Sequence, residues 1–142
     1  MILMEKIKEQ RVLCDGIISH NDKFLIIKRS SDEDIFPDKW EFPSGKIEFG
    51  EDPKDALARE VKEETGLKVL DSSLIDVRSY VFETERKIRH NIELTYVVDT
   101  EDIRVSLSDA HSEYAFVSVK DLDKYDIFDD MKILIKKANS GK

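Results

Sequence analysis

One short segment, residues 45–67, constrains the fold of this chain more than any other feature. It reads GKIEFGEDPKDALAREVKEETGL. Asp52 is a favourable N-cap, Pro53 suits the first helical position, and Gly66 suits the position just after a helix. Between them lie strong helix formers with no internal glycine or proline. The segment therefore predicts a helix that begins at Pro53 and ends before Gly66.

The same helix carries acidic side chains where they are unfavourable. At about 100° per residue, Glu60, Glu63 and Glu64 fall within roughly a third of the helix circumference. Like charges three or four residues apart repel by about 0.2–0.5 kcal/mol per pair. These glutamates also lie in the last turns of the helix, at the negative end of its dipole. We therefore expect a cation beside them.

Apolar and β-branched runs predict strands on both sides of this helix. The expected strands span residues 12–19, 23–28, 40–43, 68–70, 74–82, 89–98 and 114–117. A helical turn is expected at residues 118–121, and a closing helix at residues 127–138. The chain has no repeat, low-complexity tract or internal linker, so residues 1–142 are expected to form one α+β domain.

The net charge of the chain limits the classes of partner that it is expected to bind. The chain has 31 acidic and 23 basic residues, which give a net charge of −8. Such a surface repels nucleic acid and anionic membranes, so a polynucleotide partner is not expected. It would also repel a small phosphorylated substrate, unless a divalent metal inverts the field locally.

Cysteine use and hydropathy favour a cytoplasmic protein. The single cysteine, Cys14, has no partner for an internal disulfide, which fits a reducing compartment, and its apolar surroundings predict an inert core thiol. No apolar run approaches the length of a membrane span, so no membrane partner is expected. The opening MILM is followed at once by EKIKEQR, which is unlike a signal peptide.

The spacing of residues within 45–67 matches a known signature, Gly-x5-Glu-x7-Arg-Glu-U-x-Glu-Glu-x-Gly-U, where U is a bulky aliphatic residue. The signature is filled by Gly45, Glu51, Arg59, Glu60, Val61, Glu63, Glu64, Gly66 and Leu67. Chance agreement at every position is below roughly one in 10⁸ per starting point. The segment therefore resembles the box of the Nudix hydrolases, the MutT-like pyrophosphohydrolases.

The resemblance implies both a fold and a chemistry. The fold would be a Nudix-type α/β/α sandwich with a mixed, partly barrel-like sheet. Glu60, Glu63 and Glu64, with the backbone carbonyl of Gly45, would bind Mg²⁺, or Mn²⁺ as a substitute, because hard oxygen ligands favour these ions. The metal would polarise a phosphate and lower the pKa of a bound water. The alternative is a solvated acidic face without a ligand.

Other charged residues are expected to support the metal ligands. Arg59 can reach Asp55 or Glu63, and it would orient a ligand glutamate. Glu51 is interpreted as a supporting carboxylate near the metals, with a complement to the helix dipole as the alternative. The proton acceptor stays open between a glutamate of the box and a late one, Glu113, which is otherwise a plain exposed charge.

Candidate substrate-binding residues lie outside the box. Arg29 ends the second predicted strand and could meet phosphates, or it could form a surface ion pair. His111 is expected to be solvated. Aromatic side chains could stack on a base, although aromatics in strand patterns more often pack in a core. The candidates are Trp40, Phe36, Tyr80 and Phe82.

The leading hypothesis is a metal-dependent hydrolase of a small-molecule nucleotide. It would cleave a pyrophosphate bond in a nucleoside di- or triphosphate, including noncanonical or oxidised nucleotides, and release a nucleoside monophosphate. The alternative is a hydrolase of ADP-ribose, nucleotide sugars or dinucleoside polyphosphates. Residues 78–85 contain no proline of the kind typical of such relatives, and their tyrosine, Tyr80, lies slightly earlier than the typical position. A non-catalytic nucleotide sensor is less favoured because the box is intact. A homodimer is left open.

Overall fold

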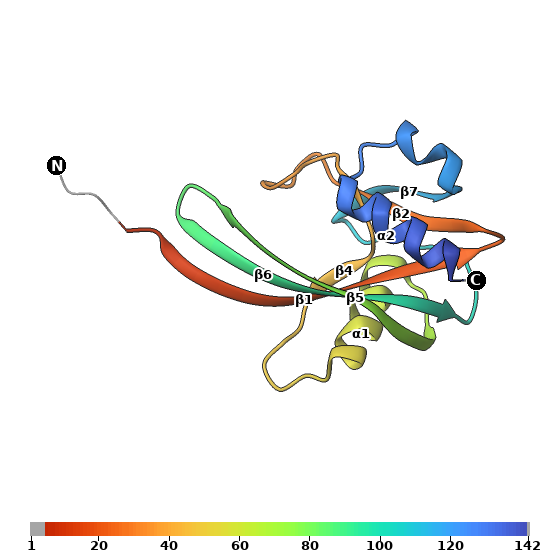
Figure 1. Cartoon of the computed structure of the whole chain (residues 1–142), viewed down its shortest axis with the longest axis horizontal. Helices are drawn as coiled ribbons and strands as arrows, with labels where there is room; N and C mark the ends of the chain where they lie inside the picture. Colours follow the sequence, from red (N-terminus) through yellow and green to blue (C-terminus); the bar gives the residue numbers. More distant parts are fainter. Residues whose placement is uncertain (1–4, 142) are drawn as a thin grey trace.

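The computed structural model describes residues 5–141 and has an α+β architecture (Figure 1). Its elements, in chain order, are β1 (Ile7–His20), β2 (Lys23–Arg29), β3 (Trp40–Glu41), β4 (Ser44–Lys46), α1 (Pro53–Thr65), β5 (Val69–Glu83), β6 (Lys87–Thr100), β7 (His111–Val117), the 3-10 helix η1 (Val119–Lys124) and α2 (Asp129–Ser140). Among the described residues, we find no helix that is long and apolar enough to cross a membrane.

The long strand β1 organises a mixed, seven-stranded sheet. The strand order is β3-β2-β1-β6-β5, while β4 pairs with β1 and β7 pairs with β2. β1 and β6 run parallel, and the other strand pairs are antiparallel. The sheet is curved but does not close into a barrel, because β3 and β5 lie at opposite ends of this order (Figure 1). The predicted sandwich with a mixed, partly barrel-like sheet is confirmed.

Two hydrophobic cores lie on opposite faces of the sheet, and one helix covers each of them (Figure 1). Successive residues of a strand point to opposite faces, so Ile18 joins the core under α1 and Ile17 joins the core under α2. α1 contributes Leu57 and Val61 to its core, and α2 contributes Leu134. Each fully buried aliphatic side chain contributes about 1.5–3 kcal/mol. These contacts fix α1, and with it the Nudix-like box, against β1.

The ends of α1 agree with the sequence. The side chain of Asp52 accepts a hydrogen bond from the backbone N–H of Lys54 at 2.9 Å, and Gly66 ends the helix with a φ of 74°. A left-handed residue at this position favours glycine, which has no Cβ to clash. The predicted helix is therefore confirmed over Pro53–Thr65.

Several strands are longer than the sequence predicts, β5 and β1 most of all. The polar residues 71–73 predict a break between two strands, but β5 continues through them. Shifts of register against β6 near Asp71 and Asp76 accommodate them. β1 begins at Ile7 rather than at residue 12, because its polar first residues pair with β6.

β4 is not among the predicted strands. Its residues pair with residues 13–15 of β1, and serine and glycine give no strand signal of their own. Phe42 and Pro43 belong to the predicted strand 40–43, but in the structure they link β3 to β4. β4 is short, yet it supports the glutamate side chains of α1.

The outer halves of three strands form an arm beyond the helices. In Figure 1, the first part of β1 and the β5–β6 hairpin extend together to one side of the molecule. Residues 7–12 of β1 pair with residues 87–92 of β6, and residues 88–92 of β6 pair with residues 79–83 of β5. The hairpin turn lies at residues 84–86, at the end of this arm (Figure 1).

Candidate active site

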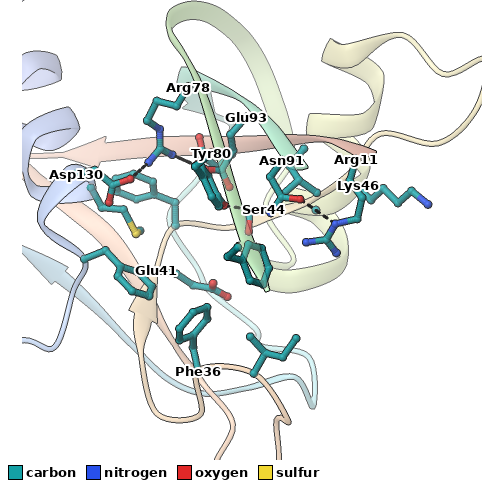
Figure 2. A pocket seen from close by; sticks show the side chains of 18 of the residues that line it. Arg11, Phe36, Glu41, Ser44, Lys46, Arg78, Tyr80, Asn91, Glu93 and Asp130 are labelled. Atoms are coloured by element: carbon teal, nitrogen blue, oxygen red, sulfur yellow. Dashed lines mark hydrogen bonds and ion pairs between the residues drawn. The ribbon is translucent and has the colours of Figure 1, made fainter. Parts of the chain in front are cut away.

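A pocket of about 530 Å³ opens between the sheet and the start of α2. Its wall includes side chains from β1, β3, β4, β5 and β6, from the loop at Phe36, and from the C-terminal end of α1, which contributes Glu64. Figure 2 shows several of these side chains converging on the pocket from different strands. The volume lies within the range typical of small-molecule sites, about 300–1,000 Å³.

Glu64 is the glutamate of α1 that lines this pocket. One carboxylate oxygen, Oε1, accepts a hydrogen bond of 2.7 Å from the backbone N–H of Ser44 in β4. Burial raises the pKa of the Glu64 carboxyl to about 8, although this hydrogen bond lowers it, and the nearby carboxylates of Glu41 and Glu60 raise it further. Glu64 is therefore a buried carboxyl in a region of excess negative charge.

Glu60 lies against the backbone of β4, and Gly45 makes this approach feasible. A Cβ added at Gly45 would lie 2.0 Å from Cδ of Glu60. Burial raises the pKa of Glu60, while the guanidinium of Arg59 opposes this shift. The backbone carbonyl of Gly45 accepts a weak hydrogen bond from Sγ of Cys14 at 3.7 Å. Burial raises the pKa of Cys14 to about 12, in agreement with an inert thiol.

Arg59 ties the acidic residues of the box together. Its Nε and Nη2 donate to the two oxygens of Glu51, each at 2.9 Å, and Nη1 donates to Oε1 of Glu60 at 2.6 Å. Nη2 also donates to the backbone carbonyl of Lys46 at 3.1 Å. Hydrogen bonds from Arg59 and from the backbone N–H of Glu48 lower the pKa of Glu51 to about 2. Arg59 thus connects α1 to the loop before it and to β4.

Glu63 lies at the solvent-exposed edge of the acidic face. Its side chain is 58% exposed, whereas those of Glu60 and Glu64 are each 15% exposed. An oxygen of Glu63 lies 3.5 Å from Nη1 of Arg59. The pairing of Arg59 with Glu63 agrees with the sequence, whereas no ion pair of Arg59 with Asp55 is found among the described residues.

Two residues that the sequence analysis missed complete the surroundings of Glu64. His111, whose side chain is 2% exposed, places Nε2 at 2.8 Å from Oε2 of Glu41 and Nδ1 at 3.7 Å from Oε2 of Glu64. Glu41 also pairs with Arg29 at 3.3 Å. The prediction of a solvated His111 is wrong, because β7 begins three residues earlier than expected and carries His111 into the interior.

Comparison with known proteins identifies the family. The NUDIX domain profile matches residues 10–137. The chain belongs to the Nudix hydrolase family. A nucleoside triphosphatase NudI from Escherichia coli O17:K52:H18 (strain UMN026 / ExPEC) is 29% identical over 125 residues, which cover 83% of this chain and 89% of the relative. A NudI from Shigella flexneri is 28% identical with the same coverage. The enzyme is therefore a Nudix pyrophosphohydrolase.

Solved structures agree with this assignment. A MutT protein from Methanosarcina mazei Go1 has a TM-score of 0.74 at 27% identity, with 95% of both chains covered. A MutT NUDIX hydrolase from Burkholderia pseudomallei has a TM-score of 0.77 at 23% identity, with 89% of this chain and 96% of that chain covered. At 23% identity, the similarity to the Burkholderia pseudomallei structure supports the fold assignment alone.

The Nudix box offers donors that suit a divalent cation, but the carboxylates of Glu51, Glu60 and Glu63 are paired with Arg59. Within residues 5–141, no three His, Cys, Asp or Glu side chains converge closely enough to enclose an ion. The donors at the box are nevertheless hard oxygens: the carboxylates of Glu60, Glu63 and Glu64 and the carbonyl of Gly45. Burial, and behind it the neighbouring carboxylates, raises the pKa of Glu60 and of Glu64, and a bound cation would offset this effect by favouring the charged forms. The residue types and their crowding therefore fit a magnesium-type site.

The aromatic candidates separate into two groups. Phe36 lines the pocket, where its ring lies 5.1 Å from that of Phe128, centroid to centroid. Tyr80 and Phe82 of β5 also line the pocket. Trp40 does not line it and packs edge-on against Tyr125 in the core under α2. The pocket position of Phe36 is the one expected of a base-stacking residue, and the position of Trp40 is that of a core residue.

The two remaining charged candidates, Arg29 and Glu113, also differ in whether they line the pocket. Arg29 lines the pocket and pairs with Glu41 and Glu33. Glu113 lies within β7 rather than in a loop, pairs with Lys28 at 3.2 Å, and does not line the pocket. Its side chain is 60% exposed. The late glutamate is therefore placed at the surface, on the same strand as the buried His111.

A basic rim borders the pocket on the arm and on β4. It consists of Arg11, Lys46 and Arg89. β6 begins at Lys87, and Arg89 within it faces the pocket. Cationic side chains at this rim complement an anionic ligand.

Proposed function

We propose that this Nudix enzyme is a metal-dependent hydrolase that converts a nucleoside triphosphate to a nucleoside monophosphate and pyrophosphate. The observation that carries the proposal is the position of Glu64, a buried carboxylate beside Glu60 that lines a nucleotide-sized pocket. Attack of water on phosphorus places charge on oxygens that are already anionic, so positioning and electrostatic stabilisation are the main requirements. The basic rim and two residues of the Nudix box, Gly45 and Glu64, lie on this same pocket.

In this proposal the box holds Mg²⁺, or Mn²⁺ as a substitute. Glu60, Glu63, Glu64 and the carbonyl of Gly45 would be its ligands, and the ion would polarise the phosphate and lower the pKa of water. Arg59 would hold Glu60 in place, since it binds that carboxylate and is itself fixed by both oxygens of Glu51.

We assign the proton-accepting role to Glu64 rather than to Glu113. Glu64 lines the pocket and has a pKa raised to about 8 by burial, whereas Glu113 is exposed and paired with Lys28. The N–H of Ser44 occupies one lone pair of Oε1 of Glu64 and leaves another for the metal, while Oε2, next to His111, would take the proton from water.

Substrate phosphates would lie between the Nudix box and the basic rim. Lys46 follows Gly45 in β4, and Arg89 and Arg11 face the pocket from neighbouring strands. Guanidinium and ammonium groups bind phosphate oxygens by charge-assisted hydrogen bonds. The base would then extend toward the aromatic side chains Phe36 and Phe82.

The proposal is tested by turnover on a panel of nucleotides. Purified protein with Mg²⁺ is incubated with the common and oxidised nucleoside triphosphates, with diphosphates and with nucleotide sugars, and pyrophosphate and phosphate are measured separately. We expect pyrophosphate from at least one triphosphate, and no turnover after chelation of the metal. Equal activity without metal would refute the mechanism. Turnover of nucleotide sugars alone would refute the substrate class.

A matched pair of variants locates the chemistry. Glu64→Gln removes the proton acceptor and is expected to lower kcat by about 10²–10⁴-fold while the protein stays folded. Asp55→Asn removes a carboxylate from the exposed side of the same helix and is expected to leave kcat unchanged. A Glu64→Gln enzyme with wild-type kcat would exclude Glu64 as the acceptor.

A further inference from the structure

An acidic cluster lies in the pocket on the side away from Phe36 (Figure 2). It consists of Asp15 on β1, Glu93 on β6 and Asp130 on α2, gathered around the guanidinium of Arg78. Nη2 of Arg78 donates to Oε2 of Glu93 at 2.6 Å and to Oδ2 of Asp15 at 3.2 Å, and Nη1 donates to Asp130. One guanidinium therefore faces three carboxyl groups. The three carboxyl groups have more acceptor oxygens than Arg78 contacts.

Several oxygens of this cluster remain without a partner among residues 5–141. Each carboxyl directs one oxygen to Arg78, and no hydrogen bond is found for Oε1 of Glu93 or Oδ1 of Asp130. Oδ1 of Asp15 also lacks a hydrogen-bond partner among these residues, but it is fully buried, so only the free oxygens of Glu93 and Asp130 are accessible from the pocket. These two oxygens can accept hydrogen bonds, so they are suited to a ligand that supplies N–H groups.

The donors of Arg78 are not available to such a ligand. Its Nη atoms donate to the three carboxyl groups, and its Nε has no hydrogen-bond partner among the described residues but is fully buried, so it is closed to a ligand. A carbonyl group of a ligand would therefore meet carboxylates rather than free donors. The cluster should favour donors over acceptors on the ligand edge that it contacts.

Aromatic side chains stand beside this acidic cluster. Tyr80 and Phe82 follow Arg78 on the same face of β5, with their rings 6.2 Å apart at 29°. Phe36 extends this aromatic group, with its ring 6.5 Å from that of Phe82. Asn91 donates to the hydroxyl of Tyr80 at 3.3 Å and thereby holds the ring. A planar base that stacks on these rings would direct an edge toward the carboxylates.

We infer that the acidic cluster binds an exocyclic amino group of the base, so that the pocket prefers amino-bearing bases to their keto counterparts. The juxtaposition of unpaired carboxylate oxygens with an aromatic wall in one pocket carries this inference, which rests on the proposed nucleotide substrate. Amino groups of guanine, cytosine and adenine donate hydrogen bonds, whereas the corresponding carbonyl of uracil only accepts, and hypoxanthine lacks the 2-amino group of guanine.

The test uses nucleoside monophosphates, because their binding does not require turnover. Two matched pairs differ at an amino group: GMP and IMP, and CMP and UMP. Dissociation constants are measured by isothermal titration calorimetry on the full chain with Mg²⁺ present. We expect the amino-bearing member of at least one pair to bind about tenfold or more tightly, since a hydrogen bond to a carboxylate is lost in the other member.

Three variants assign the preference to the cluster. Glu93→Gln and Asp130→Asn each weaken the acceptor set without changing side-chain size, and each should bring the ratio of dissociation constants toward one. Glu83→Gln removes a carboxylate from the same strand as Arg78 but outside the pocket, where it pairs with Lys6 at 2.8 Å. It should keep the wild-type ratio. Melting temperatures of all variants establish that they are folded.

The outcomes separate this inference from the proposed function. If neither pair discriminates, if no monophosphate binds, or if discrimination survives in both Glu93→Gln and Asp130→Asn, the inference is overturned. Hydrolysis of triphosphates without discrimination would leave the proposed function standing alone. Discrimination between monophosphates without hydrolysis would support the inference and refute the proposed reaction.

Discussion

Replacing Gly45 by alanine should separate the activity of this enzyme from its stability. The added Cβ would lie 2.0 Å from Cδ of Glu60 and 2.4 Å from both of its oxygens. Carbon atoms in contact lie about 3.5–4.0 Å apart, so the Glu60 carboxylate must move by about 1.5 Å. That carboxylate is the far end of a flexible side chain, so it can turn away without disrupting β4.

The two consequences of this movement differ in size. An off-rotamer side chain costs about 0.5–1.5 kcal/mol, so the free energy of unfolding should fall by about 1 kcal/mol. Displacement of a catalytic group by about 1 Å can lower the rate about 10²-fold. In the proposed mechanism Glu60 is a metal ligand, so we expect kcat/KM for pyrophosphate release to fall about 100-fold.

The assay compares initial rates of pyrophosphate release with thermal unfolding of the same samples. Gly141→Ala is the matched control, because a Cβ there meets its nearest atoms at 3.8 Å. We expect the control to match the wild type in both measurements. A Gly45→Ala enzyme with wild-type kcat/KM would show that the position of Glu60 does not matter, and a variant that fails to fold would show that Gly45 serves the packing of β4.

Four further predictions follow from the contacts of the box. Mg²⁺ at a hundred times its dissociation constant should stabilise the fold by about 2.7 kcal/mol, read as a higher melting temperature that a chelator reverses. Without metal, the folded-state pKa of Glu64 is about 8, above its ordinary value of 4.5, so the folded state binds more protons than the unfolded state. The contribution of this group to stability therefore falls as the pH rises between these values. Melting temperatures should decline less steeply from pH 5 to 9 in Glu64→Gln than in the wild type. Arg59→Lys cannot hold both oxygens of Glu51, so kcat should fall about 10–100-fold, and unchanged kinetics would contradict the role of Arg59. Glu113→Gln should retain most of the wild-type kcat, since Glu113 lies at the surface, and a loss as large as that of Glu64→Gln would restore it as the proton acceptor.

Local signals in the sequence predict the box and its helix well. Asp52 and Gly66 cap α1 as expected, because capping depends on the residue itself and on its immediate neighbours. The period of the helix places Glu60 and Glu64 on one side of it. Helix and strand types elsewhere are also predicted, and the errors concern mainly where strands begin and end.

The sequence does not predict which distant residues surround Glu64. Glu41 and His111 reach it from β3 and β7, and this contact depends on how those strands pair with β2. The only sequence signal of Glu41 is its place as a polar residue within a short apolar strand pattern, between Trp40 and Phe42. Such a signal also fits an exposed strand face, so it does not identify a site.

The acidic cluster is missed for the same reason. Asp15, Arg78, Glu93 and Asp130 come from four different elements, and no spacing in the sequence relates them. Asp15 pairs in register with Thr95 of β6, and the antiparallel pairing of β5 with β6 places Arg78 opposite Glu93. Long-range strand register, rather than local pattern, therefore builds this part of the pocket.

The location of bound manganese tests the central claim most directly. Crystals of the wild-type protein are soaked in Mn²⁺, and anomalous difference density is measured near the manganese absorption edge. The account predicts a peak in contact with the carboxylates of Glu60 and Glu64 and the carbonyl of Gly45, which disappears in Glu60→Gln crystals. Manganese-dependent turnover in crystals that show no such peak beside the box would contradict it.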